Sequence, residues 1–152
     1  MHDQNLKATH RKFAVEAFNN TWDLIDKTDR SQEEIDRMIN TAHASRYHWE
    51  IAGEAVNIAR GEWQVSRVYA ILNRAEPSLY HAKRGLEVTL DNGLKDFDLA
   101  FAYESMARAY SVAGDEIETK KFITRAEEAG QMIKDQGDKD YFFSELSTIS
   151  PG

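Results

Sequence analysis

Helical periodicity runs through this chain with few interruptions, and it constrains the fold more than any other feature. Proline occurs only at Pro77 and Pro151, so helices are rarely broken by a missing N–H. Elsewhere the apolar residues recur at steps of three and four, which places them on one face of a helix. Glycines and capping residues must therefore mark the helix ends. The sequence predicts an all-α protein.

The first two helices can be located from their apolar faces and caps. The first is expected at about residues 6–26. Its apolar face is expected to consist of Phe13, Ala17, Phe18, Trp22 and Ile25. Ser31 and Glu34 have the spacing of a capping box, so the second helix begins there, and we expect it to end near Gly53. Without a break at Gly53, one helix would continue to Arg60, which is long for a globular protein.

Three more helices follow the same punctuation. The third is expected at about residues 54–74. Pro77 suits the first helical position of the fourth helix, where its missing N–H costs nothing, and Gly93 suits the end of that helix, where a left-handed residue is common. Asp96 is expected to cap the fifth helix, which Gly114 ends. This fifth helix is apolar nearly all round, so we expect it to be the most buried one.

A sixth helix and a tail complete the chain. Asp115 and Glu118 provide an acidic cap for the sixth helix. After Gly137, apolar residues follow at the spacing of a short amphipathic helix. They are Tyr141, Phe142, Phe143, Leu146 and Ile149. Helical stacks need their exposed ends covered, so we interpret the tail as a cap over the last helix pair.

Composition narrows the possible functions. A chain of 152 residues can form one domain with a sizeable core, so we expect a single domain over residues 1–152. The net charge of -7 disfavours nucleic acid and anionic membranes as partners. The chain has no cysteine, which excludes thiolate chemistry and fits a cytoplasmic location. No apolar run reaches the roughly 18 residues of a membrane span, and residues 1–12 are too polar for a signal peptide.

Two segments of the chain match when one is shifted by 37 residues. The later segment contains Tyr103, Met106, Ala107 and Tyr110, the turn Gly114-Asp115, and then Thr119, Ile123 and Ala126. The earlier segment contains Ser66, Tyr69, Ala70 and Asn73, and then Ala82, Leu86 and Thr89. A repeat of this length is typical of stacked helix pairs.

The repeated pattern resembles the tetratricopeptide repeat over residues 54–133. This resemblance implies a right-handed stack of antiparallel helix pairs, a TPR-like α-α superhelix, with six main helices and a short C-terminal capping helix. Residues 59–64 and 76–81 are also similar to segments of a group of small bacterial helical proteins of uncharacterised function. That similarity implies no activity.

One face of the third helix carries candidate binding residues. Steps of three and four place Arg60, Gln64, Arg67 and Arg74 on this face. The 37-residue shift relates it to a face of the fifth helix with Phe97, Phe101, Glu104 and Arg108. In tetratricopeptide repeats such faces line a concave groove. The resemblance therefore implies that these eight residues share a cleft that binds a protein or peptide partner.

The arginines of this face favour an acidic segment of a partner, because guanidinium groups form bidentate hydrogen bonds with carboxylates. Phe97 or Phe101 would hold an apolar side chain of that segment. The alternative is that the arginines pair with carboxylates of the chain itself. The candidates for such pairing are Glu62, Glu76, Glu104 and Asp98.

Two other hypotheses belong to different functional classes. The first is a small-ligand or enzymatic pocket built from Arg46, His48, Trp49, Arg67, Tyr80 and His81, in which imidazole would transfer protons. No nucleophile motif or phosphate-binding glycine loop accompanies these residues, so the sequence favours binding over catalysis and indicates no cofactor. The five histidines, at positions 2, 10, 43, 48 and 81, lack the spacing of a metal site. The other hypothesis is a structural homo-oligomer whose groove is filled by its own tail.

Overall fold

The structure is a computed structural model that describes residues 2–150, with side chains described from residue 4 onward. The side chain of His2 and the residue Pro151 lie outside this part. Within it the chain forms seven helices and no strand. The helices are α1 (His2–Ile25), α2 (Gln32–Ala52), α3 (Ala55–Ile71), α4 (Ala75–Asp91), α5 (Asp96–Ala113), α6 (Glu116–Gln131) and α7 (Gln136–Leu146). The prediction of an all-α protein with six main helices and a short final one is confirmed.

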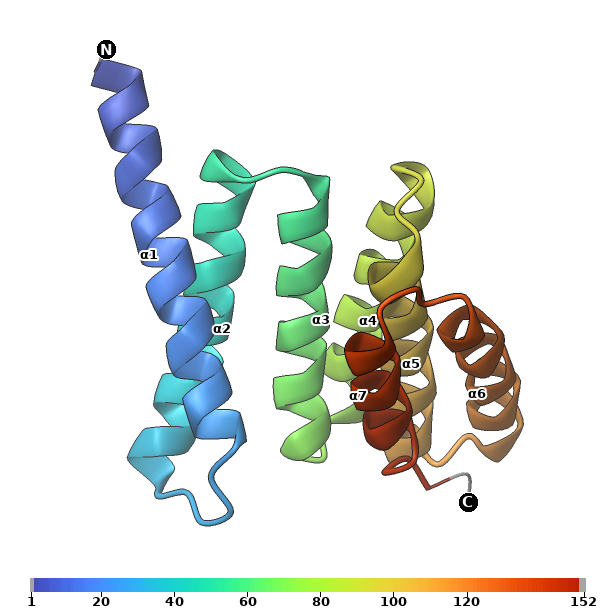
Figure 1. Cartoon of the computed structure of the whole chain (residues 1–152). Coiled ribbons are helices and arrows are strands. Elements are labelled where there is room, and N and C mark those ends of the chain that lie inside the picture. Colours follow the sequence, from blue (N-terminus) through green and yellow to red (C-terminus); the bar gives the residue numbers. More distant parts are fainter. Residues whose placement is uncertain (1, 151–152) are drawn as a thin grey trace.

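The helices form a stack of antiparallel pairs that runs from α1 to α7 (Figure 1). Each helix packs against the next one in the sequence, and α1 also contacts α3, α3 contacts α5, and α5 contacts α7. The odd-numbered helices therefore lie next to one another along one side of the stack. Helix α7 packs on both α5 and α6, so it covers the last pair as the sequence predicted.

The local signals that end the helices are mostly confirmed. The Ser31 and Glu34 side chains form the predicted capping box at the start of α2. At Gly53 the backbone is extended and α2 stops. A Cβ at this position would lie 2.7 Å from Cε3 of Trp49 and 2.8 Å from Cβ of Asn57, so the tight turn between α2 and α3 requires glycine.

The predicted end of α3 and the predicted start of α4 are wrong by two or three residues. Helix α3 ends at Ile71, because Asn73 adopts a left-handed backbone with φ of 60°. Helix α4 begins at Ala75, so Pro77 is its third residue rather than its first. The first turn has no intrahelical partner for its N–H groups, which is why proline fits there all the same.

The cap of α5 also differs from the prediction. Lys95 is the N-cap residue, and Asp96 is the first residue of the helix. The Asp96 carboxylate accepts hydrogen bonds from the backbone N–H of Phe97 at 2.8 Å and from that of Lys134 at 3.1 Å. It thereby ties the start of α5 to the segment after α6.

The core consists of two apolar clusters. One lies among α4, α5, α6 and α7 and includes Phe101 and Phe142, and the other lies among α1, α2 and α3 and includes Met38 and Val65. The predicted apolar face of α1 is only partly buried, and Phe13 is exposed. Helix α1 is at the end of the stack, so its outer side has no helix to cover it. Helix α3 has as many buried residues as α5, which corrects the expectation for α5.

None of the described helices has the length and hydrophobicity needed to cross a membrane.

Candidate functional site

The odd-numbered helices line an open cleft of about 720 Å³. We call it the odd-helix cleft. Its lining residues are Phe18, Trp22, Ile25 and Asp26 from α1 and its end, Arg60, Trp63 and Arg67 from α3, Phe97 from α5, and Asp138, Tyr141 and Glu145 from α7. The opposite walls are α1 and α7, and α3 lies between them. Residues far apart in the sequence therefore meet in one hollow.

Three of the eight predicted binding residues line this cleft: Arg60, Arg67 and Phe97. Gln64, Phe101 and Glu104 do not, because all three are buried. Each has an internal partner. The Gln64 amide donates to the backbone oxygen of Phe18 at 2.9 Å, the Phe101 ring packs against other aromatic rings of the core, and the Glu104 carboxylate binds arginines.

The remaining two predicted residues lie outside the cleft. Arg74 is exposed beyond the end of α3, and its guanidinium lies 5.3 Å from the Tyr69 ring. Because α3 ends at Ile71, Arg74 does not continue the arginine face. Arg108 contacts the C-terminal end of α7 and the residues that follow it. It donates to the backbone oxygen of Glu145 at 3.0 Å and to the Thr148 hydroxyl at 2.8 Å.

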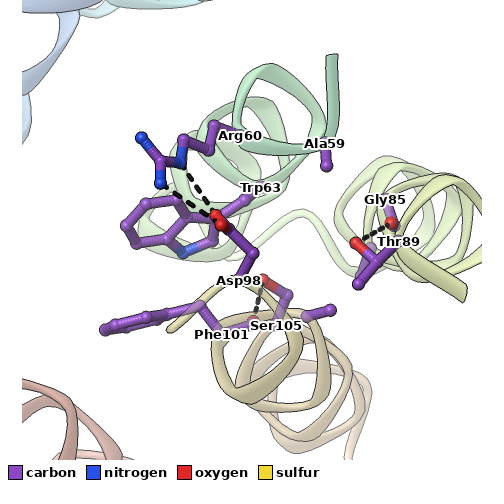
Figure 2. A pocket seen from close by; sticks show the side chains of 10 residues that line it. Ala59, Arg60, Trp63, Gly85, Thr89, Asp98, Phe101 and Ser105 are labelled. Atoms are coloured by element: carbon purple, nitrogen blue, oxygen red, sulfur yellow. Dashed lines mark hydrogen bonds and ion pairs between the residues drawn. The ribbon is translucent and has the colours of Figure 1, made fainter. Parts of the chain in front are cut away.

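Arg60 joins α3 to α5 through an ion pair with Asp98. Its Nε and Nη2 atoms donate to the two carboxylate oxygens of Asp98 at 2.8 and 3.2 Å (Figure 2). These hydrogen bonds raise the pKa of Arg60, and its guanidinium also lies 5.8 Å from the centre of the Phe97 ring. The cavity beside this pair holds only about 10 Å³, which is room for about one water molecule.

Arg67 is the centre of a buried charge network. Its Nη2 atom donates to Glu104 Oε2 at 3.0 Å, and its Nη1 atom donates to Glu145 Oε1 at 2.9 Å. Arg108 Nη2 donates to the same Glu104 oxygen at 2.8 Å. Burial would lower the pKa of Arg67, but the charges of Glu104 and Glu145 outweigh it and raise the pKa. The network connects α3, α5 and α7.

The ion pairs change the expectation about the ligand. Both arginines that line the cleft are bound to carboxylates of the chain itself, as the alternative interpretation of the sequence proposed for Asp98 and Glu104. An acidic ligand would have to displace these internal partners. The specific reason to expect an acidic segment is therefore lost.

All the apolar side chains that line the cleft are aromatic except Ile25. The Trp22 and Trp63 ring centres are 5.4 Å apart, and those of Trp63 and Phe97 are 6.2 Å apart. Tyr141, on the α7 wall, has 46% of its surface exposed. Such rings provide large contact areas with little conformational freedom to lose, which suits a surface that binds another molecule.

The second predicted pocket does not form as a unit. His48 lies against α1, with its Nδ1 atom 2.8 Å from Nδ1 of His10, and the Trp49 ring lies under the guanidinium of Arg11. His81 belongs to α4 and contacts Glu62 of α3 rather than His48, and Tyr80 is exposed. Arg67 faces the odd-helix cleft. The prediction of this pocket is wrong because it groups residues that are adjacent in the sequence. A helix places adjacent residues on different faces.

Arg46 and His81 of that predicted pocket both contact Glu62, for which the sequence suggested only a surface pairing with an arginine. Arg46 Nε donates to one oxygen of buried Glu62 at 2.7 Å, and His81 Nδ1 lies 2.7 Å from the other. Burial would raise the pKa of Glu62, but these two hydrogen bonds outweigh it and lower the pKa. His43 lies beside His81, with Nε2 2.8 Å from the Tyr69 hydroxyl. The cluster connects α2, α3 and α4.

Within residues 4–150 no group of three or more histidine, aspartate or glutamate side chains is arranged to hold a metal ion. Comparisons with protein-family models, with curated proteins and with solved structures found no match to the chain. The odd-helix cleft is therefore the candidate site on the basis of its geometry alone.

Several residues of the cleft were not singled out as binding residues from the sequence. Phe18, Trp22 and Ile25 were assigned to the core face of the first helix, and Tyr141 to the tail cap. Their signal was available, because the helix at each end of a stack has an apolar face that only one neighbour covers. Asp26, Asp138 and Glu145 carried no distinguishing pattern.

Proposed function

We propose that this protein is a binding module of the tetratricopeptide type, whose odd-helix cleft holds a short segment of another protein. One observation carries the proposal: a single hollow of about 720 Å³ is lined from four helices by five aromatic side chains. Ligand sites are concave and largely apolar, with a few polar groups that fix orientation. The same side of helical stacks commonly provides the binding surface.

The proposal favours binding over catalysis and includes a cytoplasmic location, which the lack of cysteine supports. His48 and His81, which the predicted small-ligand or enzymatic pocket would need, contact different residues and lie outside the cleft. No observation favours the homo-oligomer with a tail-filled groove, because the tail helix forms a wall of the cleft rather than occupying it.

The test is a selection of short peptides from a random display library on the immobilised protein. The affinities of the selected peptides are then measured for the unaltered protein, for Tyr141→Ala and for Tyr80→Ala. Tyr80 is the matched control, because it is an exposed tyrosine on α4 with no place in the cleft. Loss of an aromatic anchor at an interface typically costs about 2 kcal/mol or more. We therefore expect Tyr141→Ala to raise the dissociation constant roughly thirtyfold and Tyr80→Ala to leave it unchanged.

The proposal fails if no peptide is enriched, or if the enriched peptides bind both tyrosine variants equally well. Circular dichroism spectra of the two variants should match that of the unaltered protein, so that a loss of binding is not a loss of folding.

A further inference from the structure

The cleft has two carboxylates that are not engaged by the chain itself. Asp26 lies at the end of α1 on one wall, and Asp138 lies in the first turn of α7 on the other. Both are exposed, and within residues 4–150 neither carboxylate takes part in a hydrogen bond or an ion pair. The nearby Arg30 donates instead to the backbone oxygens of Leu24 and Ile25.

The two arginines that line the cleft already form ion pairs within the chain. Arg60 is bound by Asp98, and Arg67 is bound by Glu104 and Glu145. Asp138 lies near enough to Arg60 to contribute to its raised pKa but does not pair with it. The cleft therefore offers negative charge to a ligand and no free positive charge.

The aromatic lining suits the same kind of ligand. Cations bind over the faces of aromatic rings, and most strongly over tryptophan. The chain already makes one such contact at the edge of the cleft, where the Arg60 guanidinium lies over the Phe97 ring. Trp22 lies one helical turn before Asp26, and Tyr141 lies one helical turn after Asp138, so each free carboxylate shares its wall of the cleft with an aromatic ring.

We propose that the odd-helix cleft selects partner segments that carry lysine or arginine next to apolar residues, with the basic side chains bound between Asp26 and Asp138. The apolar residues of the segment lie on Phe18, Ile25 and the tryptophans. This inference rests on the proposed function of the cleft and adds the chemical class of the partner. It replaces the acidic segment that the sequence favoured.

The experiment uses three synthetic peptides of the same length. They share their leucine and tryptophan positions and carry lysine, glutamine or glutamate at the same two sites. Binding is measured by fluorescence anisotropy at low ionic strength. We expect the lysine peptide to bind about tenfold more tightly than the glutamine peptide, because exposed ion pairs and cation–π contacts each contribute modestly. The glutamate peptide should bind most weakly.

The variant that tests the site is Asp26→Asn combined with Asp138→Asn, which should remove most of the preference for the lysine peptide. The matched control is Asp36→Asn combined with Asp91→Asn. Both control residues are exposed and lie outside the cleft, and their substitution changes the net charge by the same amount. If the control loses the preference for the lysine peptide to the same extent, the preference arises from the overall charge of the protein, and the inference is overturned.

The peptides also separate this inference from the proposed function. Equal binding of all three peptides that Tyr141→Ala abolishes would refute the basic subsite and leave the cleft as a binding surface. Absence of binding by every peptide, in this series and in the library selection, would refute both.

Discussion

Replacing Glu104 by glutamine tests whether the buried charge network holds the C-terminal half together. The Glu104 side chain is fully buried, and its Oε2 atom accepts from Arg67 at 3.0 Å and from Arg108 at 2.8 Å. Glutamine has nearly the same shape, so the substitution removes the charge without opening a cavity. Any loss of stability then reports the electrostatic contribution.

The expected loss follows from these two hydrogen bonds. The arginine donors stay charged when glutamine is the acceptor, so each bond remains charge-assisted and should lose about 1 kcal/mol of the roughly 1.5–3 kcal/mol that a hydrogen bond to a charged group contributes. Arg67 keeps Glu145 as a partner, whereas Arg108 has no other ion pair within the described residues. The Oε1 atom of Glu104 has no hydrogen-bond partner, so nothing is lost there. We expect the free energy of unfolding to fall by about 2 kcal/mol.

The assay is urea denaturation followed by circular dichroism. Glu116→Gln is the control, because Glu116 forms an exposed ion pair with Lys120 that should contribute less than about 0.5 kcal/mol. Arg108→Met is then combined with Glu104→Gln. If the loss arises because the partly buried Arg108 has lost its only ion pair in residues 4–150, Arg108→Met should cost at least about 1 kcal/mol less in the Glu104→Gln background. A loss no larger than that of the control, or strictly additive effects, would refute the reasoning.

Three further predictions concern other contacts. A Cβ added at Gly130 would overlap the ring of buried Phe142, whose Cδ2 atom would be 2.7 Å away, so Gly130→Ala should destabilise the protein by about 1–3 kcal/mol. Gly137→Ala should not lower stability in the same urea titration. Burial lowers the pKa of His43 from 6.5, so the folded state favours the neutral form. Unfolding free energy should therefore decline as the pH falls below 6.5, and His43→Gln should flatten that slope. The two hydrogen-bond partners of Glu62 outweigh its burial and lower its pKa from 4.5. Its contribution is complete above pH 4.5 and is lost as the pH falls through the lowered pKa, so Glu62→Gln should flatten the acid unfolding curve.

Local signals made most of the fold predictable. The capping box at Ser31, the glycine at position 53 and the left-handed Gly114 each determine a helix end through a few neighbouring residues. The boundary at Ile71 was missed because it depends on Asn73, a residue that adopts the left-handed conformation less commonly than glycine. Helix order then led to the stack, because short connections favour antiparallel neighbours.

The candidate site was less predictable, because it depends on how each helix is rotated. A predicted face of Arg60, Gln64 and Arg67 differs by one position from the observed face of Arg60, Trp63 and Arg67. That difference places Gln64 against α1 and brings Trp63 into the cleft. The pairing of Arg67 with Glu145 joins residues that are 78 positions apart, and no pattern within one helix reports such a contact.

Helix α7 serves both as the cover of the last helix pair and as a wall of the cleft. Attachment of the C-terminal helix and occupancy of the cleft are therefore linked equilibria. A partner that touches Asp138 and Tyr141 should slow amide hydrogen exchange in residues 136–146, even at positions it does not contact. Conversely, a protease that cuts between α6 and α7 and so releases α7 would abolish recognition of the partner, while four of the six larger helices, α1 to α4, keep all their helix neighbours.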